Sequence, residues 1–166
     1  MVIRHYAKSI VYGGMDGIVT TFAVVAGAVG GHLGFQAILI LGFSNLLADG
    51  FSMAVGDYLS STTEESEIKA KAVKNAVATF ISFVLFGLIP LLSYLLIDVI
   101  SLFRAHTFLI ACILVSLALS LLGLVKAVIT NTSKKKEILR TLVIGLTASL
   151  FAYYIGDILG RLIGTH

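Results

Sequence analysis

Two aspartates and one methionine stand inside apolar stretches of this sequence, where acidic residues are rare. Asp16 lies in the stretch 10–31, and Asp49 and Met53 lie in the stretch 37–59. A charge at mid-bilayer costs about 2.5–3.5 kcal/mol on insertion scales, so such residues normally face a partner, a water-filled cavity or an ion. Carboxylates bind hard divalent ions, and thioether sulfur binds softer ones. The set therefore favours a borderline first-row ion, Fe²⁺ or Mn²⁺, over Ca²⁺ or Mg²⁺.

The second apolar stretch carries a stripe of small and polar residues at helical spacing. The stripe consists of Gly42, Asn45, Asp49, Ser52, Met53, Gly56 and Ser60. Such a stripe can line a pathway, or it can only pack helices together, because small and polar residues also stabilise helix contacts in lipid. The two acids Asp49 and Asp57 favour a pathway. Met53 also has a competing interpretation, in which its side chain only packs in the apolar core.

The rise of a helix allows the depths of these side chains to be compared. At about 1.5 Å per residue, Asp16 and Met53 both lie roughly 9 Å from the membrane edge where the first stretch begins and the second ends. Asp49 is then one turn deeper, level with Thr20. The sequence predicts a ladder of polar groups, with Asp16, Met53 and Asp49 as metal ligands, and Asp49, Asp57, Thr20 and Asn45 as pathway or proton-coupling residues.

The composition indicates an integral membrane protein. Of 166 residues, 58% are hydrophobic and 13% are charged, with a mean hydropathy of +1.01, whereas soluble domains carry about 25% charged residues. We expect one transmembrane domain, residues 1–166, embedded in a lipid bilayer. The single cysteine, Cys112, excludes an internal disulfide framework. The net charge of +3 does not indicate nucleic acid binding, because the basic residues flank the apolar stretches. No cofactor is expected.

The apolar stretches predict an all-α fold of five transmembrane helices, at about residues 10–31, 37–59, 76–97, 107–129 and 138–163. The connection 32–36 is short, so the first two helices should be antiparallel neighbours. Pro90 follows Gly87 within the third stretch, and a proline there should kink that helix.

Lysines and arginines predict the orientation of these helices. Threading five spans puts ten of the twelve on the side of the amino terminus, and only Arg104 and Arg161 on the other. Because cytoplasmic loops carry an excess of basic residues, we expect a cytoplasmic amino terminus and a carboxyl terminus on the opposite side. In a prokaryote the membrane would be the plasma membrane.

The most polar segment, 60–75, joins the second and third helices. It contains an acidic cluster of Glu64, Glu65 and Glu67, followed by lysines. This order suits a helix that continues at the membrane face, with acids in its first turn. A solvated helix end is the favoured interpretation, and attraction of cations to a cytoplasmic entry is the alternative.

Glycines in the first helix predict close helix packing. Two G-x-x-x-G spacings are formed by Gly13, Gly17, Gly27 and Gly31, and such spacings let helix backbones approach. One subunit offers few intramembrane ligands for a six-coordinate ion. We therefore expect a homodimer that packs through these glycines and shares the site. The alternative is that they pack against the second helix of the same subunit.

Several motifs resemble the vacuolar iron transporter family. DGIVTTFAVVAGAVGG at 16–31 and ILGFSNLLADGFSMAVGDYLS at 40–60 are closely similar to its first two helices. GLIP at 87–90 and the glycine and tyrosine pattern of 145–156 are weaker matches to later helices. The resemblance implies five transmembrane helices, a homodimer with the ion path at the subunit interface, and proton-coupled export of Fe²⁺ or Mn²⁺ from the cytoplasm.

The family's intramembrane metal ligands are an aspartate of the DGI motif and a methionine of the SMA motif. These match Asp16 and Met53 here. Many members insert a long, glutamate-rich metal-binding domain between the second and third helices, whereas this chain has only the segment 60–75. The resemblance therefore implies a short form without that domain. Asp57 stands where relatives often have glutamate.

Two other classes compete with a transporter. An intramembrane aspartyl protease needs GxGD and PAL motifs, and the chain has only VGD at 55–57 and IGD at 155–157. We therefore expect no enzyme. A non-transporting membrane adaptor is the alternative function, and it predicts that Asp16 and Asp49 can be neutralised without loss.

Overall fold

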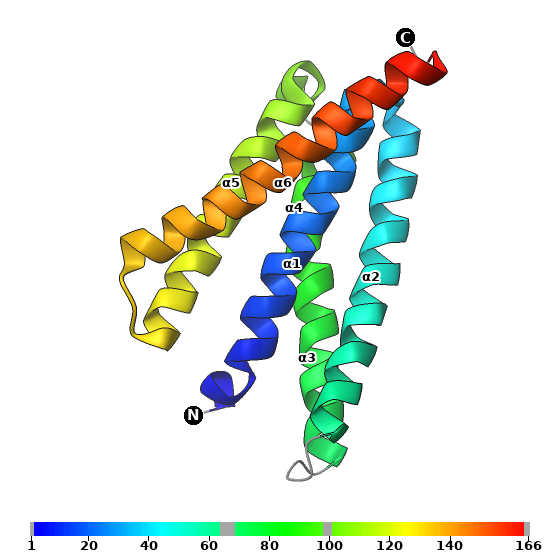
Figure 1. Ribbon diagram of the computed structural model, residues 1–166. Helices are drawn as coiled ribbons and strands as arrows, with labels where there is room; N and C mark the ends of the chain where they lie inside the picture. The colour runs from blue at the N-terminus through cyan, green and yellow to red at the C-terminus, as the bar shows by residue number, and fades with distance from the viewer. Residues whose placement is uncertain (1, 64–68, 98–100, 165–166) are drawn as a thin grey trace.

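A computed structural model describes residues 2–63, 69–97 and 101–164 of the chain (Figure 1). The described residues form the helices α1 (Val2–Gly30), α2 (Phe35–Thr63), α3 (Lys69–Gly87), α4 (Ile89–Leu95), α5 (Ser101–Thr130) and α6 (Lys134–Ile163). These ranges contain no β-strand. The prediction of an all-α membrane protein is confirmed.

Five of these helices are long and apolar enough to cross a membrane. The candidate spans are Lys8–Gly30, Phe35–Thr62, Lys69–Gly87, His106–Thr130 and Lys134–Ile163. The observed helices extend beyond most of the predicted apolar stretches, because their polar flanks remain helical. The acidic cluster Glu64, Glu65 and Glu67 lies outside the described residues.

The third predicted helix differs most from the structure, because it is two helices and not one kinked span. α3 ends at Gly87 and α4 begins at Ile89, with Leu88 between them. Pro90 lies in the first turn of α4. A proline has no backbone N–H to donate to the preceding turn, but it is well accommodated at the start of a helix. The proline therefore marks a new helix start.

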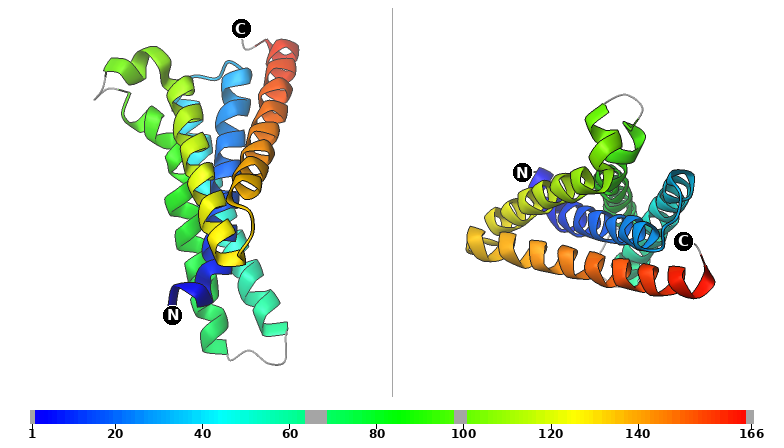
Figure 2. Two further views of the ribbon diagram at one scale, coloured as in Figure 1. Left: turned by 90° about the vertical axis from the view of Figure 1, so that its left-hand side faces the viewer. Right: turned by 90° about the horizontal axis from the view of Figure 1, so that it is seen from above.

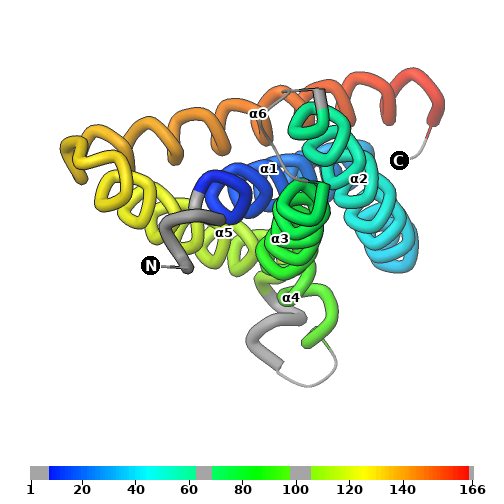
Figure 3. The backbone as a smooth tube through the Cα atoms, turned by 90° about the horizontal axis from the view of Figure 1, so that it is seen from below, coloured from blue at the N-terminus to red at the C-terminus, as the bar shows by residue number. Residues whose placement is uncertain are grey.

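α1 lies at the centre of the bundle, between α6 on one side and α3 and α5 on the other (Figures 2 and 3). Its Ile18, Phe22 and Val25 side chains are at most 1% exposed. They belong to the same core as Phe83 of α3 and Leu119 of α5. α2 packs mainly on α3, and its outer face is open. The helix that carries Asp16 is thus held from several sides.

Glycine allows α1 to approach α3 very closely. A Cβ atom on Gly13 would lie 2.7 Å from the carbonyl oxygen of Thr79. A Cβ on Gly17 would lie 3.0 Å from the Cα atom of Phe83 and closer still to its carbonyl oxygen. Both neighbours belong to the α3 backbone, so only glycine permits this separation.

The other end of α1 meets α6 in the same manner. A Cβ on Gly27 would lie 3.3 Å from the carbonyl oxygen of Ala152, and one on Gly31 would lie 3.4 Å from that of Gly156. The four glycines predicted to join two subunits therefore pack α1 inside one chain. They face α3 and α6, whereas the alternative prediction named the second helix. Their spacing predicted the close approach, but it did not identify the partner.

Basic residues gather at one end of the molecule, which we call the basic end. The amino terminus, the end of α2, the start of α3 and the turn between α5 and α6 all lie there (Figure 1). These element ends carry Lys8, Lys69, Lys71, Lys74, Lys126, Lys134, Lys135, Lys136 and Arg140. The carboxyl terminus and the turn between α1 and α2 lie at the opposite end.

Candidate metal pathway between α1 and α2

Two antiparallel rows of functional side chains run along α1 and α2. Residues spaced by four lie on one face of a helix. The first row is Lys8, Tyr12, Asp16 and Thr20 on α1, and the second is Asn45, Asp49, Met53 and Asp57 on α2. Apart from Lys8 and Tyr12, which are exposed, these residues are half-buried. Both rows therefore lie at the edge of the packed bundle.

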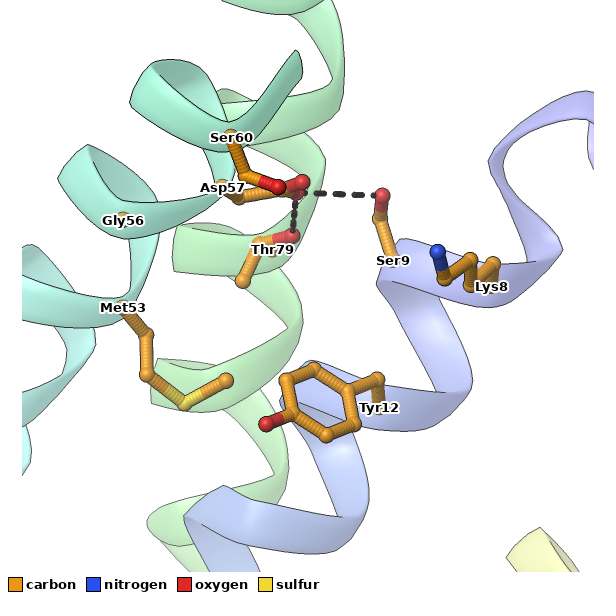
Figure 4. Close-up of a pocket in the computed structure, with 8 residues that line it drawn as sticks. All are labelled: Lys8, Ser9, Tyr12, Met53, Gly56, Asp57, Ser60 and Thr79. Carbon is orange, nitrogen blue, oxygen red and sulfur yellow. Dashed lines mark hydrogen bonds between the residues drawn. The ribbon is translucent and has the colours of Figure 1, made fainter. Parts of the chain in front are cut away.

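A cavity opens between the two rows at the basic end. Its volume is about 450 Å³, and its lining residues are Lys8, Ser9, Tyr12, Met53, Gly56, Asp57, Ser60 and Thr79 (Figure 4). The Met53 side chain and the Tyr12 ring extend toward one another across the gap between α2 and α1. Met53 also packs against the core, so the two interpretations of this residue are compatible. The cavity is lined by one carboxylate, one thioether, several hydroxyl groups and the Lys8 side chain.

Asp57 joins three helices at this cavity. Its Oδ2 atom accepts a hydrogen bond of 3.2 Å from the Ser9 hydroxyl of α1 and one of 2.5 Å from the Thr79 hydroxyl of α3 (Figure 4). The second carboxylate oxygen has no partner among the described residues. Asp57 is thus fixed in place and keeps an oxygen that can bind a cation.

The Ser9–Asp57 hydrogen bond sets the register between α1 and α2. One turn further in, Met53 lies opposite Tyr12 (Figure 4). By the same register, Asp49 lies opposite Asp16 one turn deeper. The sequence predicted Asp16 level with Met53, so the prediction differs by one turn, about 6 Å. The difference arises because α1 begins at Val2, eight residues before the predicted membrane edge, whereas α2 continues only four residues past that edge, to Thr63.

Asp16 and Asp49 form the deeper part of the two rows. Neither lines the open cavity, but the two carboxylates are near enough for their charges to interact. No basic side chain of the described part lies within ion-pair distance of either. Two like charges in a low-dielectric setting repel strongly, and a divalent cation held between them would remove that repulsion.

Other acids of the described chain are already paired. Glu137 lies 2.7 Å from the Lys126 ammonium, and Asp157 lies 2.9 Å from the Arg161 guanidinium. Among the acids that the structure describes, only the aspartates of the two rows have no basic side chain within ion-pair distance. The contrast separates the acids that stabilise helix ends from those that can bind a mobile cation.

Thr20 and Asn45 continue the rows toward the middle of the bundle. The Thr20 hydroxyl donates to the backbone carbonyl of Asp16 at 2.8 Å, so its proton is used within α1. The Nδ2 group of Asn45 is buried and has no partner in the described structure, and the same holds for the Thr21 hydroxyl. An unsatisfied buried amide is costly, and a water molecule in the pathway would satisfy it.

No cluster of three or more His, Cys, Asp or Glu side chains in the described ranges could hold a metal ion. The two rows supply one carboxylate at Asp57, a thioether one turn further in and two carboxylates at the deepest step, which differs from a closed structural metal site. Sequence reasoning missed Ser9, Tyr12 and Thr79, although Tyr12 precedes Asp16 by the same four-residue step.

A family model described as the VIT family matches the chain over residues 7–72 and 62–157. The Vacuolar iron transporter of Plasmodium berghei is 25% identical over 226 residues, which cover 94% of this chain and 83% of that protein. Its counterpart from Plasmodium falciparum is 25% identical over 222 residues, covering 92% and 81%. Both alignments exceed the 166 residues of this chain, so these relatives carry residues that it lacks.

The Vacuolar iron transporter of Toxoplasma gondii is 48% identical over 66 residues. This match covers 40% of the chain and 22% of that protein, so it spans about a fifth of the relative. The two family matches overlap at residues 62–72, in the polar connection between α2 and α3, and together they include nearly the whole chain. The predicted resemblance is confirmed, and this chain belongs to the VIT family.

Proposed function

We propose that this chain transports a divalent transition metal ion, Fe²⁺ or Mn²⁺, out of the cytoplasm in exchange for protons. The observation that carries the proposal is the pair of facing rows on α1 and α2, with the cavity at their basic end. The names of the relatives, vacuolar iron transporters, agree with a metal ion as the substrate.

The basic end faces the cytoplasm in this proposal. Positively charged residues concentrate on cytoplasmic loops, and they gather at this end of the helices. The cavity beside Asp57 is then the cytoplasmic entry, and the carboxyl terminus lies on the opposite side. An ion that enters there meets Met53 before it reaches the two deeper aspartates.

The ion exchanges its water ligands for side-chain ligands along this path. Asp57 offers an unpaired carboxylate oxygen, Met53 offers sulfur, and Asp16 and Asp49 offer charge at the deepest step. A thioether favours Fe²⁺ or Mn²⁺ over Mg²⁺ and Ca²⁺. After the ion leaves, protons can neutralise the same carboxylates, which couples metal movement to proton movement. Asp49 is our first choice for this exchange, and Asp57 is the second.

A homodimer would complete the ligand set. A single chain presents two carboxylates and one sulfur near the deep step, whereas first-row divalent ions commonly take up to six ligands. Polar or small residues of α2, Ser52, Gly56 and Ser60, are exposed in the isolated chain, and Tyr12 of α1 is 66% exposed. A second copy that covers this side would bring two copies of Asp16 together. This interface replaces the one that the glycine spacing predicted.

Reconstitution into proteoliposomes tests the proposal. We expect uptake of Fe²⁺ or Mn²⁺ together with a pH change reported by an enclosed dye, and a protonophore should abolish accumulation above equilibrium. Mg²⁺ should be a poor substrate. Absence of metal flux from folded protein would favour the alternative of a non-transporting membrane adaptor. If a protonophore leaves metal accumulation unchanged, proton coupling is refuted but metal transport is not.

A further inference from the structure

A second cavity at the basic end lies between α1 and α5, next to the cavity of the metal pathway, with which it shares Lys8 and Tyr12. Its volume is about 400 Å³. Two lysines, one from each helix, stand above an otherwise largely apolar lining, and the residues that matter here are Lys8, Val11, Tyr12, Met15, Lys126 and Ile129. We call this the α1–α5 groove. The pathway proposed above does not use its α5 side, which carries Lys126 and Ile129.

The charge of the α1–α5 groove is positive. Lys126 lies 2.7 Å from Glu137, but Glu137 is also 3.9 Å from Arg140, so two cations share one acid. An ammonium group has three N–H donors, which leaves Lys126 with donors for a further partner. Lys8 is exposed and is the second cationic side chain that lines the groove. An anion is therefore the ligand that fits the charged part of the groove.

The position of the groove places it at a membrane–water boundary. Lys8 begins the first candidate span, and Lys126 lies one turn before the end of the fourth span at Thr130. Tyr12 is 66% exposed beside them, and tyrosine is enriched at this level of membrane proteins. Val11 and Met15 extend the lining toward the bilayer interior. A ligand with an anionic head and an apolar tail would match both parts.

We propose that the α1–α5 groove binds an anionic phospholipid. The headgroup phosphate lies between the Lys8 and Lys126 ammonium groups, and the upper part of an acyl chain lies along Val11 and Met15. Basic pockets between transmembrane helices are suited to such headgroups. A free phosphate ion would leave the apolar lining in contact with water, so the lipid is the better fit. The bound lipid would connect α1 to α5 beside the metal entry.

Fluorescence quenching by brominated lipids tests this inference. The chain contains no tryptophan, so a Val128→Trp substitution, at a residue 60% exposed next to Ile129, gives a single reporter. The protein is placed in mixed phosphatidylcholine and phosphatidylglycerol vesicles, with one of the two lipids brominated at a time. A second reporter, Val73→Trp, lies on α3 at the same end and is 49% exposed before substitution. No metal is present, so the result is independent of transport.

We expect the reporter at position 128 to prefer phosphatidylglycerol. Lys8→Gln with Lys126→Gln should lower that preference by as much as about 25-fold, since each lysine near the surface contributes about fivefold. Lys69→Gln with Lys74→Gln removes the same charge on α3 and should leave this reporter unchanged. Lys8→Arg with Lys126→Arg should retain the preference, which controls for misfolding.

Three results would overturn the inference. The first is a reporter at position 128 that shows no preference for phosphatidylglycerol over phosphatidylcholine. The second is an equal loss of preference from the groove pair and from the α3 pair, which would indicate general surface charge. The third is complete displacement of the lipid by excess inorganic phosphate, which would assign the groove to a free anion.

Discussion

An alanine at Gly17 should force α1 away from α3. A Cβ atom there would overlap the carbonyl oxygen of Phe83 and lie 3.0 Å from the carbonyl carbon and the Cα atom of that residue. Ordinary contact begins near 3.4 Å, so the two carbon contacts alone require a separation of about 0.4 Å, and the closer carbonyl oxygen requires a larger one. The obstructing atoms are backbone and cannot rotate aside. Overpacking of this kind costs about 1–3 kcal/mol.

Gly56→Ala is the matched control for packing inside one chain, because no atom in the described part of the same chain lies within 4 Å of a Cβ at that position. Both glycines lie inside long helices, so both substitutions gain a similar helix propensity of about 0.8–1.0 kcal/mol. The difference between the two variants therefore isolates the steric cost. At about 2–4 °C per kcal/mol for a chain of this size, the Gly17 variant should melt about 2–12 °C below the Gly56 variant.

Thermal melting of the purified variants, read by size-exclusion chromatography after heating, measures both stability and oligomeric state. Equal melting temperatures would refute the close packing of α1 on α3. A change in oligomeric state with an unchanged melting temperature would show that Gly17 faces another subunit, as its spacing first suggested.

Two further predictions concern the entry and the orientation. Asp57→Asn keeps an oxygen for its two hydroxyl donors but removes the charge. Initial rates of metal uptake should therefore fall several-fold, while the melting temperature is retained. Unchanged uptake would exclude a role of Asp57 in metal entry. On a Cys112→Ala background, an impermeant thiol reagent applied to intact cells should label Gly164→Cys, and should label Lys134→Cys only after permeabilisation. The reverse labelling pattern would invert the orientation.

Hydropathy predicted the five spans because burial in lipid requires long apolar helices. It did not predict their ends, since α2 continues through polar residues to Thr63 and α3 begins at Lys69. The register differs by one turn from the predicted one because α1 extends further past the predicted membrane edge than α2 does. Pro90 indicated that the third span is not a regular helix. Whether the helix bends or ends at Leu88 depends on its packing against other helices, which the sequence alone does not show.

The acids of the pathway were predictable, because a charged side chain in an apolar helix is costly and normally faces a partner or an ion. Met53 was predicted from its place in the same stripe and from the family resemblance. Ser9 and Thr79 were not, because hydroxyl side chains within helices usually bond to their own backbone, as Thr20 does. Only the arrangement of three helices shows that both hydroxyls converge on Asp57. Likewise, glycine spacing predicts that another helix packs closely, but it does not identify that helix.

Metal flux through Asp16 and Met53 variants tests the central claim most directly. Asp16→Asn keeps the size of the side chain and removes its charge, and Met53→Leu keeps most of the packing and removes the sulfur. In proteoliposomes, with melting temperature as the control for folding, Asp16→Asn should abolish or nearly abolish Fe²⁺ and Mn²⁺ flux. Met53→Leu should weaken the flux and shift the preference toward harder ions. Wild-type flux and selectivity in both variants would contradict a metal pathway between α1 and α2.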